Sequence, residues 1–224
     1  MSDAAVRLPI VVLISGTGSN LRAIAARATA GTLPVEIRAV VSDKPESKGL
    51  AWAAAQGITT VALPARDYPD RAAFDRALAD TVAGFAPGLV VLAGFMRILG
   101  DEFVDRFAGR LVNIHPSLLP KYRGLHTHRR ALEAGDREHG ASVHFVTREL
   151  DGGPVVLQAR VPVRDGDDES TLAAKVLAEE HLIYPECIGW FAAGRLRMHD
   201  GAAYLDGRRL DTPVVRAARA TSNG

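Results

Sequence analysis

The sequence predicts an α/β fold whose doubly wound, mostly parallel sheet is extended by antiparallel strands in the C-terminal half. Continuous apolar, β-branched runs at residues 9–14 and 89–93 are typical of strands buried on both faces of a parallel sheet. Helical spacing fills the segments that alternate with the strands, which indicates crossover helices. Apolar and polar residues then alternate over 141–147 and 155–163, which indicates two half-buried strands that pair across a turn.

Composition and charge exclude several classes of protein. The chain has 224 residues, 47% hydrophobic and 24% charged, with a formal net charge of +1, so nothing indicates a broad nucleic-acid-binding face. The single cysteine, Cys187, excludes an intrachain disulfide framework and a Cys-rich metal site. No apolar run reaches the roughly 20 residues of a membrane span, and residues 1–9 lack a signal-peptide pattern. We expect a cytoplasmic, single-domain protein (residues 1–224), a monomer or a homodimer, with no nucleic-acid or membrane partner.

The first strand leads into a glycine-rich turn and then into a helix that begins near Leu21. Free N–H groups and the dipole at such a helix N-terminus favour a phosphate, so Gly16–Asn20 is a candidate anion site; the alternative is a tight turn that binds nothing. No Gly-Lys-Ser/Thr follows, which excludes a Walker A loop, and Leu21 occupies the third glycine position of a dinucleotide fingerprint. Asp43 could still mimic a ribose-binding acid, which leaves a nicotinamide enzyme open.

The chain then continues in alternating elements. Arg71 falls in the first turn of a predicted helix, where the dipole disfavours a cation; it indicates either an anionic partner or a solvated side chain. The apolar segment Gly94–Gly100 follows a strand and either lines a pocket or packs in the core. The expected elements are a strand at 35–41, a helix at 49–56, a strand at 59–63, a helix at 67–83, a strand at 89–93, a helix at 101–107 and a strand at 111–114.

Asn113 and His115 form a candidate reaction centre. Residues two apart in an extended segment point to the same side, and Pro116 holds His115 extended. Ligands of parallel sheets bind at the carboxyl ends of the strands. We therefore expect Gly16–Asn20, Gly94–Leu99 and Asn113–Ser117 to share one rim.

A third group is needed to orient His115, and Asp151 is the candidate. A carboxylate beside an imidazole fixes the tautomer and favours the charged ring. The alternative is turn chemistry, because Asp151 precedes Gly-Gly-Pro. His144 is interpreted as a structural histidine. His126 and His128 are interpreted as part of a basic loop, with metal binding as the alternative.

A long helix is expected from Leu172 to about Ala193. Glu180 falls on its apolar face, where a carboxylate needs a partner: either a structural cation or a substrate ammonium. Pro185 is expected to kink or split the helix. The tail 211–224 is expected to be flexible.

Four stretches together resemble a known family. They are Leu13–Leu21, Ala93–Leu99, Asn113–Pro120 and Ser142–Pro154. The chain resembles, from about residue 10 to 210, the phosphoribosylglycinamide formyltransferases, folate-dependent enzymes of purine synthesis with a formyltransferase-like fold. The resemblance implies a nucleotide-phosphate half at about 1–100 and a catalytic and folate half at about 101–210.

The resemblance also implies a role for individual residues. Asn113, His115 and Asp151 would be catalytic. The ribonucleotide would be held by Gly18, Ser19 and Asn20 at its phosphate and by Glu180 at its glycinamide end. The folate would be contacted by Arg71, Met96, Arg97, Ile98, Leu99 and Asn113.

The implied reaction transfers the formyl group of 10-formyltetrahydrofolate to the amino group of glycinamide ribonucleotide, with no metal required. Three alternatives stay open. A tRNA-directed formyltransferase should carry a further basic C-terminal domain, and a formyltetrahydrofolate hydrolase usually carries an N-terminal regulatory domain. The third is a nucleotide-binding module without enzymatic activity.

Overall fold

The parallel part of the larger sheet is arranged around β1 (Leu8–Ile14). β1 pairs in parallel with β2 (Val35–Ser42) on one side and with β4 (Leu89–Leu92) on the other. β3 (Thr60–Ala62) continues this part beyond β2, and β5 (Leu111–His115) continues it beyond β4. The strand order reverses between β1 and β4, so the carboxyl ends of these two strands border the crevice where such sheets bind ligands.

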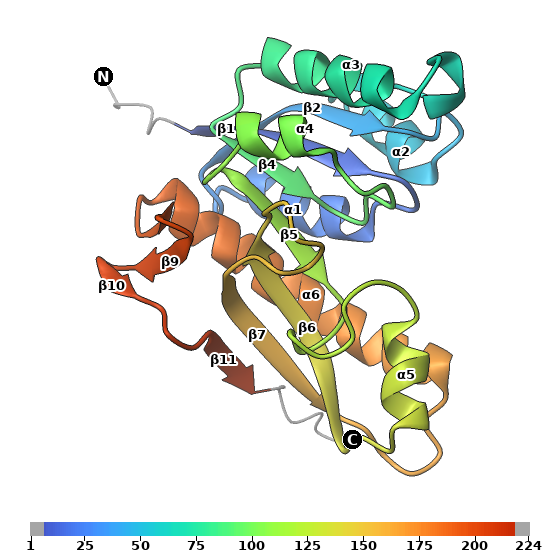
Figure 1. The fold of residues 1–224 in the computed structure, drawn as a ribbon, viewed down its shortest axis with the longest axis vertical. Helices are drawn as coiled ribbons and strands as arrows, with labels where there is room; N and C mark the ends of the chain where they lie inside the picture. The colour runs from blue at the N-terminus through green and yellow to red at the C-terminus, as the bar shows by residue number, and fades with distance from the viewer. Residues whose placement is uncertain (1–6, 218–224) are drawn as a thin grey trace.

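The computed structural model describes residues 7–217. In it, β6 (Glu138–Phe145) and β7 (Val155–Pro162) extend the sheet by antiparallel pairing, and β11 (Val214–Ala217) adds a parallel edge. The full order is β11-β7-β6-β5-β4-β1-β2-β3, shown in Figure 1. The predicted fold class is confirmed. A separate antiparallel sheet contains β8 (Leu196–His199), β9 (Ala202–Leu205) and β10 (Arg208–Arg209).

Helices cover both faces of the sheet, and the alternation of β1 matches them. Ile10, Val12 and Ile14 face one core, and Val11 and Leu13 face the other, as the period of two along a strand requires. The face of Ile10, Val12 and Ile14 carries α1 (Ser19–Thr29), α2 (Lys48–Ala55), α5 (Thr127–Glu133) and α6 (Glu169–Ala192). The opposite face carries α3 (Arg71–Gly84) and α4 (Asp101–Arg106), seen above the sheet in Figure 1.

No helix of residues 7–217 is both long and apolar enough to cross a membrane.

Two helix predictions need correction. The helix expected from residue 67 begins at Arg71, because Asp70 caps it by accepting from Ala73 N–H at 2.7 Å; a short 3₁₀ turn, Ala65–Asp67, precedes it. Of the two outcomes expected for Pro185, the split is wrong, because α6 is continuous from Glu169 to Ala192, and the kink stays a prediction. Buried residues on both sides of Pro185 pack into one core, so tertiary packing outweighs the missing hydrogen bond.

Two predictions about the C-terminal half are also wrong. β6 is not half-buried: Ser142 and His144 are 0% and 2% exposed, because neighbouring segments cover the second face of the strand. The tail expected to be flexible from residue 211 contains β11, whose Val214 and Val215 pair with Leu157 and Gln158 of β7. The rest of that tail, 218–224, lies outside the described residues.

Candidate active site

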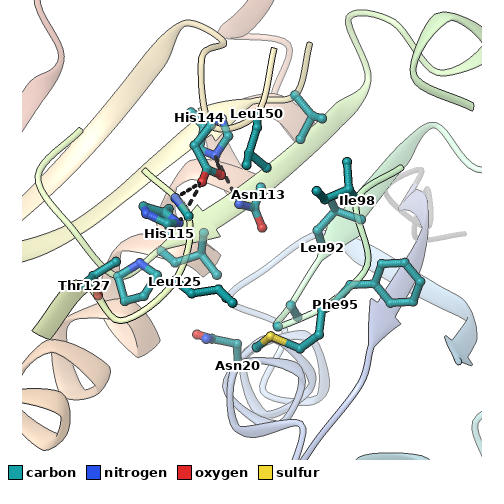
Figure 2. Close-up of a pocket in the computed structure, with 18 of the residues that line it drawn as sticks. Asn20, Leu92, Phe95, Ile98, Asn113, His115, Leu125, Thr127, His144 and Leu150 are labelled. Carbon is teal, nitrogen blue, oxygen red and sulfur yellow. Dashed lines mark hydrogen bonds and ion pairs between the residues drawn. The ribbon is translucent and has the colours of Figure 1, made fainter. Parts of the chain in front are cut away.

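A cavity of about 640 Å³ opens at the carboxyl ends of β1, β4 and β5. The three loops expected to share one rim all contribute to its wall, together with the segments 124–128 and 146–151. Figure 2 shows His115, Asn113 and His144 grouped in this cavity, with Asn20, Phe95 and Ile98 along other parts of its wall. Of the residues assigned from the sequence, the structure brings together Gly18, Ser19, Asn20, Met96, Arg97, Ile98, Leu99, Asn113, His115, Asp151 and Glu180.

His115 and Asp151 meet although they lie on different elements. His115 Nδ1 is 3.5 Å from Asp151 Oδ2, and both side chains are less than one-tenth exposed. His115 Nε2 lies 2.9 Å from the Tyr122 carbonyl oxygen, which can only accept, so this nitrogen donates. A ring that carries hydrogen on both nitrogens therefore satisfies both neighbours. Asp151 is held in turn by Gly124 N–H, which donates to Oδ2 at 2.9 Å.

His144 is the side chain whose place in the site was missed by the sequence reasoning. Its Nδ1 donates to the Phe145 carbonyl at 2.9 Å, and burial lowers the pKa of His144 to about 4. The ring is therefore neutral near pH 7, and its 3.7 Å approach to Asp151 Oδ1 is not an ion pair. The free Nε2 accepts from Asn113 Nδ2 at 3.1 Å, which fixes how the Asn113 amide is turned.

The pairing of β5 with β6 explains why His144 lies there. Asn113 is directly opposite His144 in the antiparallel register, so the two side chains meet on one face of the sheet. The alternation over 141–147 places His144 on a strand, but no sequence signal specifies this register.

The glycine-rich turn forms the predicted helix N-terminus. Gly18 has a φ of 71°, and a Cβ there would lie 2.9 Å from Gly49 Cα, so the position requires glycine. α1 begins at Ser19 with no side-chain cap on its first N–H groups. Asn20 Nδ2 donates to Glu180 Oε2 at 2.7 Å. Burial raises the pKa of Glu180, while Asn20 Oδ1 is buried with no partner among the described residues.

Exposed apolar side chains gather at the cavity. Met96, Ile98, Leu125 and Leu150 are 66%, 58%, 69% and 49% exposed and all line it, and a patch of this kind indicates a ligand with apolar surface. Arg71 is the one assigned residue that does not line the cavity. Its guanidinium instead donates to the Ile98 carbonyl at 3.0 Å and reaches Asp75 at 3.4 Å.

His126 and His128 do not form a metal centre with other side chains of the described chain. Over residues 7–217, no group of three or more His, Cys, Asp and Glu is arranged to hold an ion. His128 Nδ1 instead lies 3.1 Å from His139 Nε2.

Known proteins with a similar sequence or structure include several phosphoribosylglycinamide formyltransferases. Residues 8–188 match the formyl transferase family. The phosphoribosylglycinamide formyltransferase of Escherichia coli K12 is 59% identical over 201 residues, which cover 90% of this chain and 95% of that protein. The solved structure of the phosphoribosylglycinamide formyltransferase from Coxiella burnetii is 50% identical with a TM-score of 0.89, covering 93% of this chain and 99% of that one. A formyltetrahydrofolate deformylase from Burkholderia mallei is 27% identical with a TM-score of 0.81, covering 91% of this chain and 71% of that one.

Proposed function

Because this chain belongs to the formyl transferase family and groups with its phosphoribosylglycinamide formyltransferases, we propose that Asn113, His115 and Asp151 carry out its chemistry. The chain transfers a formyl group from a folate cosubstrate to the amino group of phosphoribosylglycinamide, in purine biosynthesis. The observation that supports the assignment of these three residues is their convergence, far apart in sequence, in one cavity with a helix N-terminus and an apolar wall.

The chemistry requires donors where negative charge develops. The neutral amine attacks the formyl carbon, and the formyl oxygen becomes a tetrahedral oxyanion. Asn113 Nδ2 keeps a second hydrogen free of His144, and a charged His115 supplies another donor; each such donor is typically worth about 10²–10³ in rate. Asp151 stabilises the charged ring and takes part in moving the amine proton to the leaving nitrogen, directly or through water.

His115 cannot serve the formyl oxygen while both of its nitrogens are engaged. One nitrogen faces Tyr122 O and the other faces Asp151. Substrate binding must therefore replace one of these acceptors. The Tyr122 carbonyl is the weaker partner because it carries no charge.

The ribonucleotide is placed by the opposite side of the cavity. Gly18, Ser19 and Asn20 offer N–H groups and the positive end of the α1 dipole to its phosphate. Glu180 and the unpaired Asn20 Oδ1 are acceptors, which suits the donor-rich glycinamide end.

The folate is placed by the apolar wall. Met96, Arg97, Ile98 and Leu99 line one side, and Asn113 joins them at the reacting end. Arg71 contacts this loop from outside through Ile98 O, so a direct folate contact requires its exposed side chain to turn. We propose 10-formyltetrahydrofolate as the formyl donor and a reaction that needs no metal.

Turnover of the purified chain tests this assignment. With 10-formyltetrahydrofolate and glycinamide ribonucleotide, His115→Ala should lower kcat about 10²–10³-fold and Asp151→Asn about a hundredfold. The matched controls are His199→Ala and Asp200→Asn: these residues form an exposed histidine–aspartate pair at 3.1 Å, and Asp200, like Asp151, has a positive φ. Full activity in Asp151→Asn would remove Asp151 from the mechanism.

Hydrolysis of the formyl donor is the second function that the same residues could support. The deformylase from Burkholderia mallei shares the fold, and water could replace the amine as nucleophile. Release of tetrahydrofolate at the same rate with and without glycinamide ribonucleotide would favour hydrolysis over transfer.

A further inference from the structure

Asp43 is not among the residues that line the cavity, but hydrogen bonds connect its carboxylate to a loop that does. Asp43 follows β2, and its Oδ1 accepts a hydrogen bond from Ser15 Oγ at 2.6 Å. The same Ser15 Oγ accepts from Met96 N–H at 2.9 Å, and Ser15 N–H donates to the Gly94 carbonyl at 3.1 Å. Asp43 and Ser15 thus join the ends of β2, β1 and β4, three neighbouring strands of the sheet.

The direction of these hydrogen bonds shows that Asp43 orients the Ser15 hydroxyl and that Ser15 binds the Met96 amide. A hydroxyl has one hydrogen and two lone pairs. Because Ser15 gives its hydrogen to the Asp43 carboxylate, its lone pairs are left to face Met96 N–H. A bond of 2.6 Å to a carboxylate lies in the range of strong, charge-assisted hydrogen bonds. Without Asp43, the hydroxyl is free to turn its hydrogen elsewhere and the Met96 bond loses its fixed acceptor.

Ser15 therefore holds the start of the loop that supplies the apolar wall. Gly94 has a φ of 81°, so the chain bends just before the Gly94 carbonyl and the Met96 amide that Ser15 binds. Ser15 itself is 3% exposed, whereas the Met96 and Ile98 side chains beyond this turn are mostly exposed in the cavity. The loop has little core packing of its own at these positions, and the hydrogen bonds from Ser15 set where it begins.

The glycine-rich loop next to Ser15 has a separate anchor. Gly49 N–H donates to the Gly16 carbonyl at 3.0 Å, and Gly18 packs directly against Gly49. The helix N-terminus that faces the phosphate is thus held by α2, independently of Asp43.

We propose that Asp43 is a positioning residue that acts through Ser15 to hold the Gly94–Leu99 loop in the shape that binds the folate cosubstrate. The proposal rests on the assignment of that loop to the folate, given above. It predicts an effect on folate binding that leaves ribonucleotide binding unchanged, since only the folate side depends on the Ser15–Met96 bond.

Asp43→Ala, Asp43→Asn and Ser15→Ala test this in the full chain. The KM for 10-formyltetrahydrofolate should rise about tenfold in Asp43→Ala and in Ser15→Ala, the effect of losing one charge-assisted hydrogen bond. Asp43→Asn keeps an acceptor oxygen for Ser15 and should stay within about twofold of the parent. The KM for the ribonucleotide should not change in any of them. The double variant should be no worse than Ser15→Ala, because both changes remove one unit.

Two measurements separate this proposal from other causes. Equilibrium binding of tetrahydrofolate, followed without turnover, reports on the loop even if the parent chain catalyses a different reaction, so failure of the proposed function leaves this arm readable. Asp67→Ala removes a mostly exposed aspartate beyond β3 and is the matched control. Equal rises in both KM values would mean that Asp43 has a general structural role. Unchanged tetrahydrofolate affinity in Ser15→Ala and Asp43→Ala would mean that it has no role in folate binding. Either result overturns the proposal, and Ser15→Ala decides alone if Asp43→Ala does not fold.

Discussion

Two buried histidines of the site differ in what they can do because their partners differ. His115 faces a carbonyl oxygen and a carboxylate, and both accept, so the ring is suited to donate. His144 donates to one carbonyl and is buried. Because burial keeps the ring neutral, its second nitrogen carries no hydrogen and accepts from Asn113. A histidine suited to donate and a neutral histidine that accepts thus lie on neighbouring strands, and the second fixes how the Asn113 amide is turned.

The neutral state of His144 makes stability depend on pH. Its folded pKa is about 4, below the ordinary 6.5, so between these values the unfolded chain binds the proton and the folded chain does not. Stability is therefore lost as pH falls from about 6.5 to 4, by up to roughly 3 kcal/mol for this group. His144→Gln cannot titrate and keeps an oxygen for Asn113. Urea unfolding of parent and variant at pH 7 and pH 5 should show a smaller loss in the variant.

His199→Gln is the control for that comparison, because His199 is an exposed histidine outside the cavity wall. Identical pH dependence in the parent chain and in His144→Gln would show that His144 is not held neutral by the fold.

At the scale of elements, α6 organises the ends of the strands that form the site. Tyr184 is fully buried, and its hydroxyl reaches the Leu92 carbonyl at 2.8 Å and the Val112 carbonyl at 3.1 Å. These carbonyls belong to β4 and β5, each one residue before a part of the cavity wall. The helix thus connects the ends of the two strands that border the cavity.

Tyr184→Phe removes that hydroxyl without changing the shape of the ring. The single hydroxyl hydrogen that the two buried carbonyls share is lost, so the free energy of unfolding should fall by about 1–2 kcal/mol, measured by urea denaturation. Tyr204→Phe, in β9 of the small sheet, is the control for the loss of a tyrosine hydroxyl. A value for Tyr184→Phe no larger than that of the control would show that the bridge contributes nothing to stability.

At the scale of the whole molecule, the features that depend on short sequence patterns could be predicted, and the contacts between distant segments could not. The buried strands, the glycine-rich turn and the shared rim depend on short patterns and on the geometry of parallel sheets, so β1, β4 and Gly16–Asn20 are where the sequence places them. The Asn113–His144 contact depends on antiparallel register, and the Asp151–His115 contact depends on two loops that meet only in the folded chain. Residue types made Asp151 a candidate, and only the family resemblance singled it out.

The edge strand β11 was missed for a related reason: four residues make a weak pattern, and their stability comes from β7 and α6. Val214 packs against the core, and Arg216 pairs with Glu186 of α6.

Truncation after Asp211 tests whether this strand matters to the whole fold. Removing β11 exposes the edge of β7 and deletes the four-residue pairing, so the free energy of unfolding should fall by about 1–3 kcal/mol and the bare edge should favour self-association. Neither β11 nor β7 lines the cavity, so kcat and both KM values should stay within about twofold at temperatures where the variant is folded. Truncation after Ala217 keeps β11 and serves as the control. Equal unfolding free energies and equal gel-filtration profiles for the two truncations would mean that β11 neither stabilises the fold nor protects the edge of β7 from self-association.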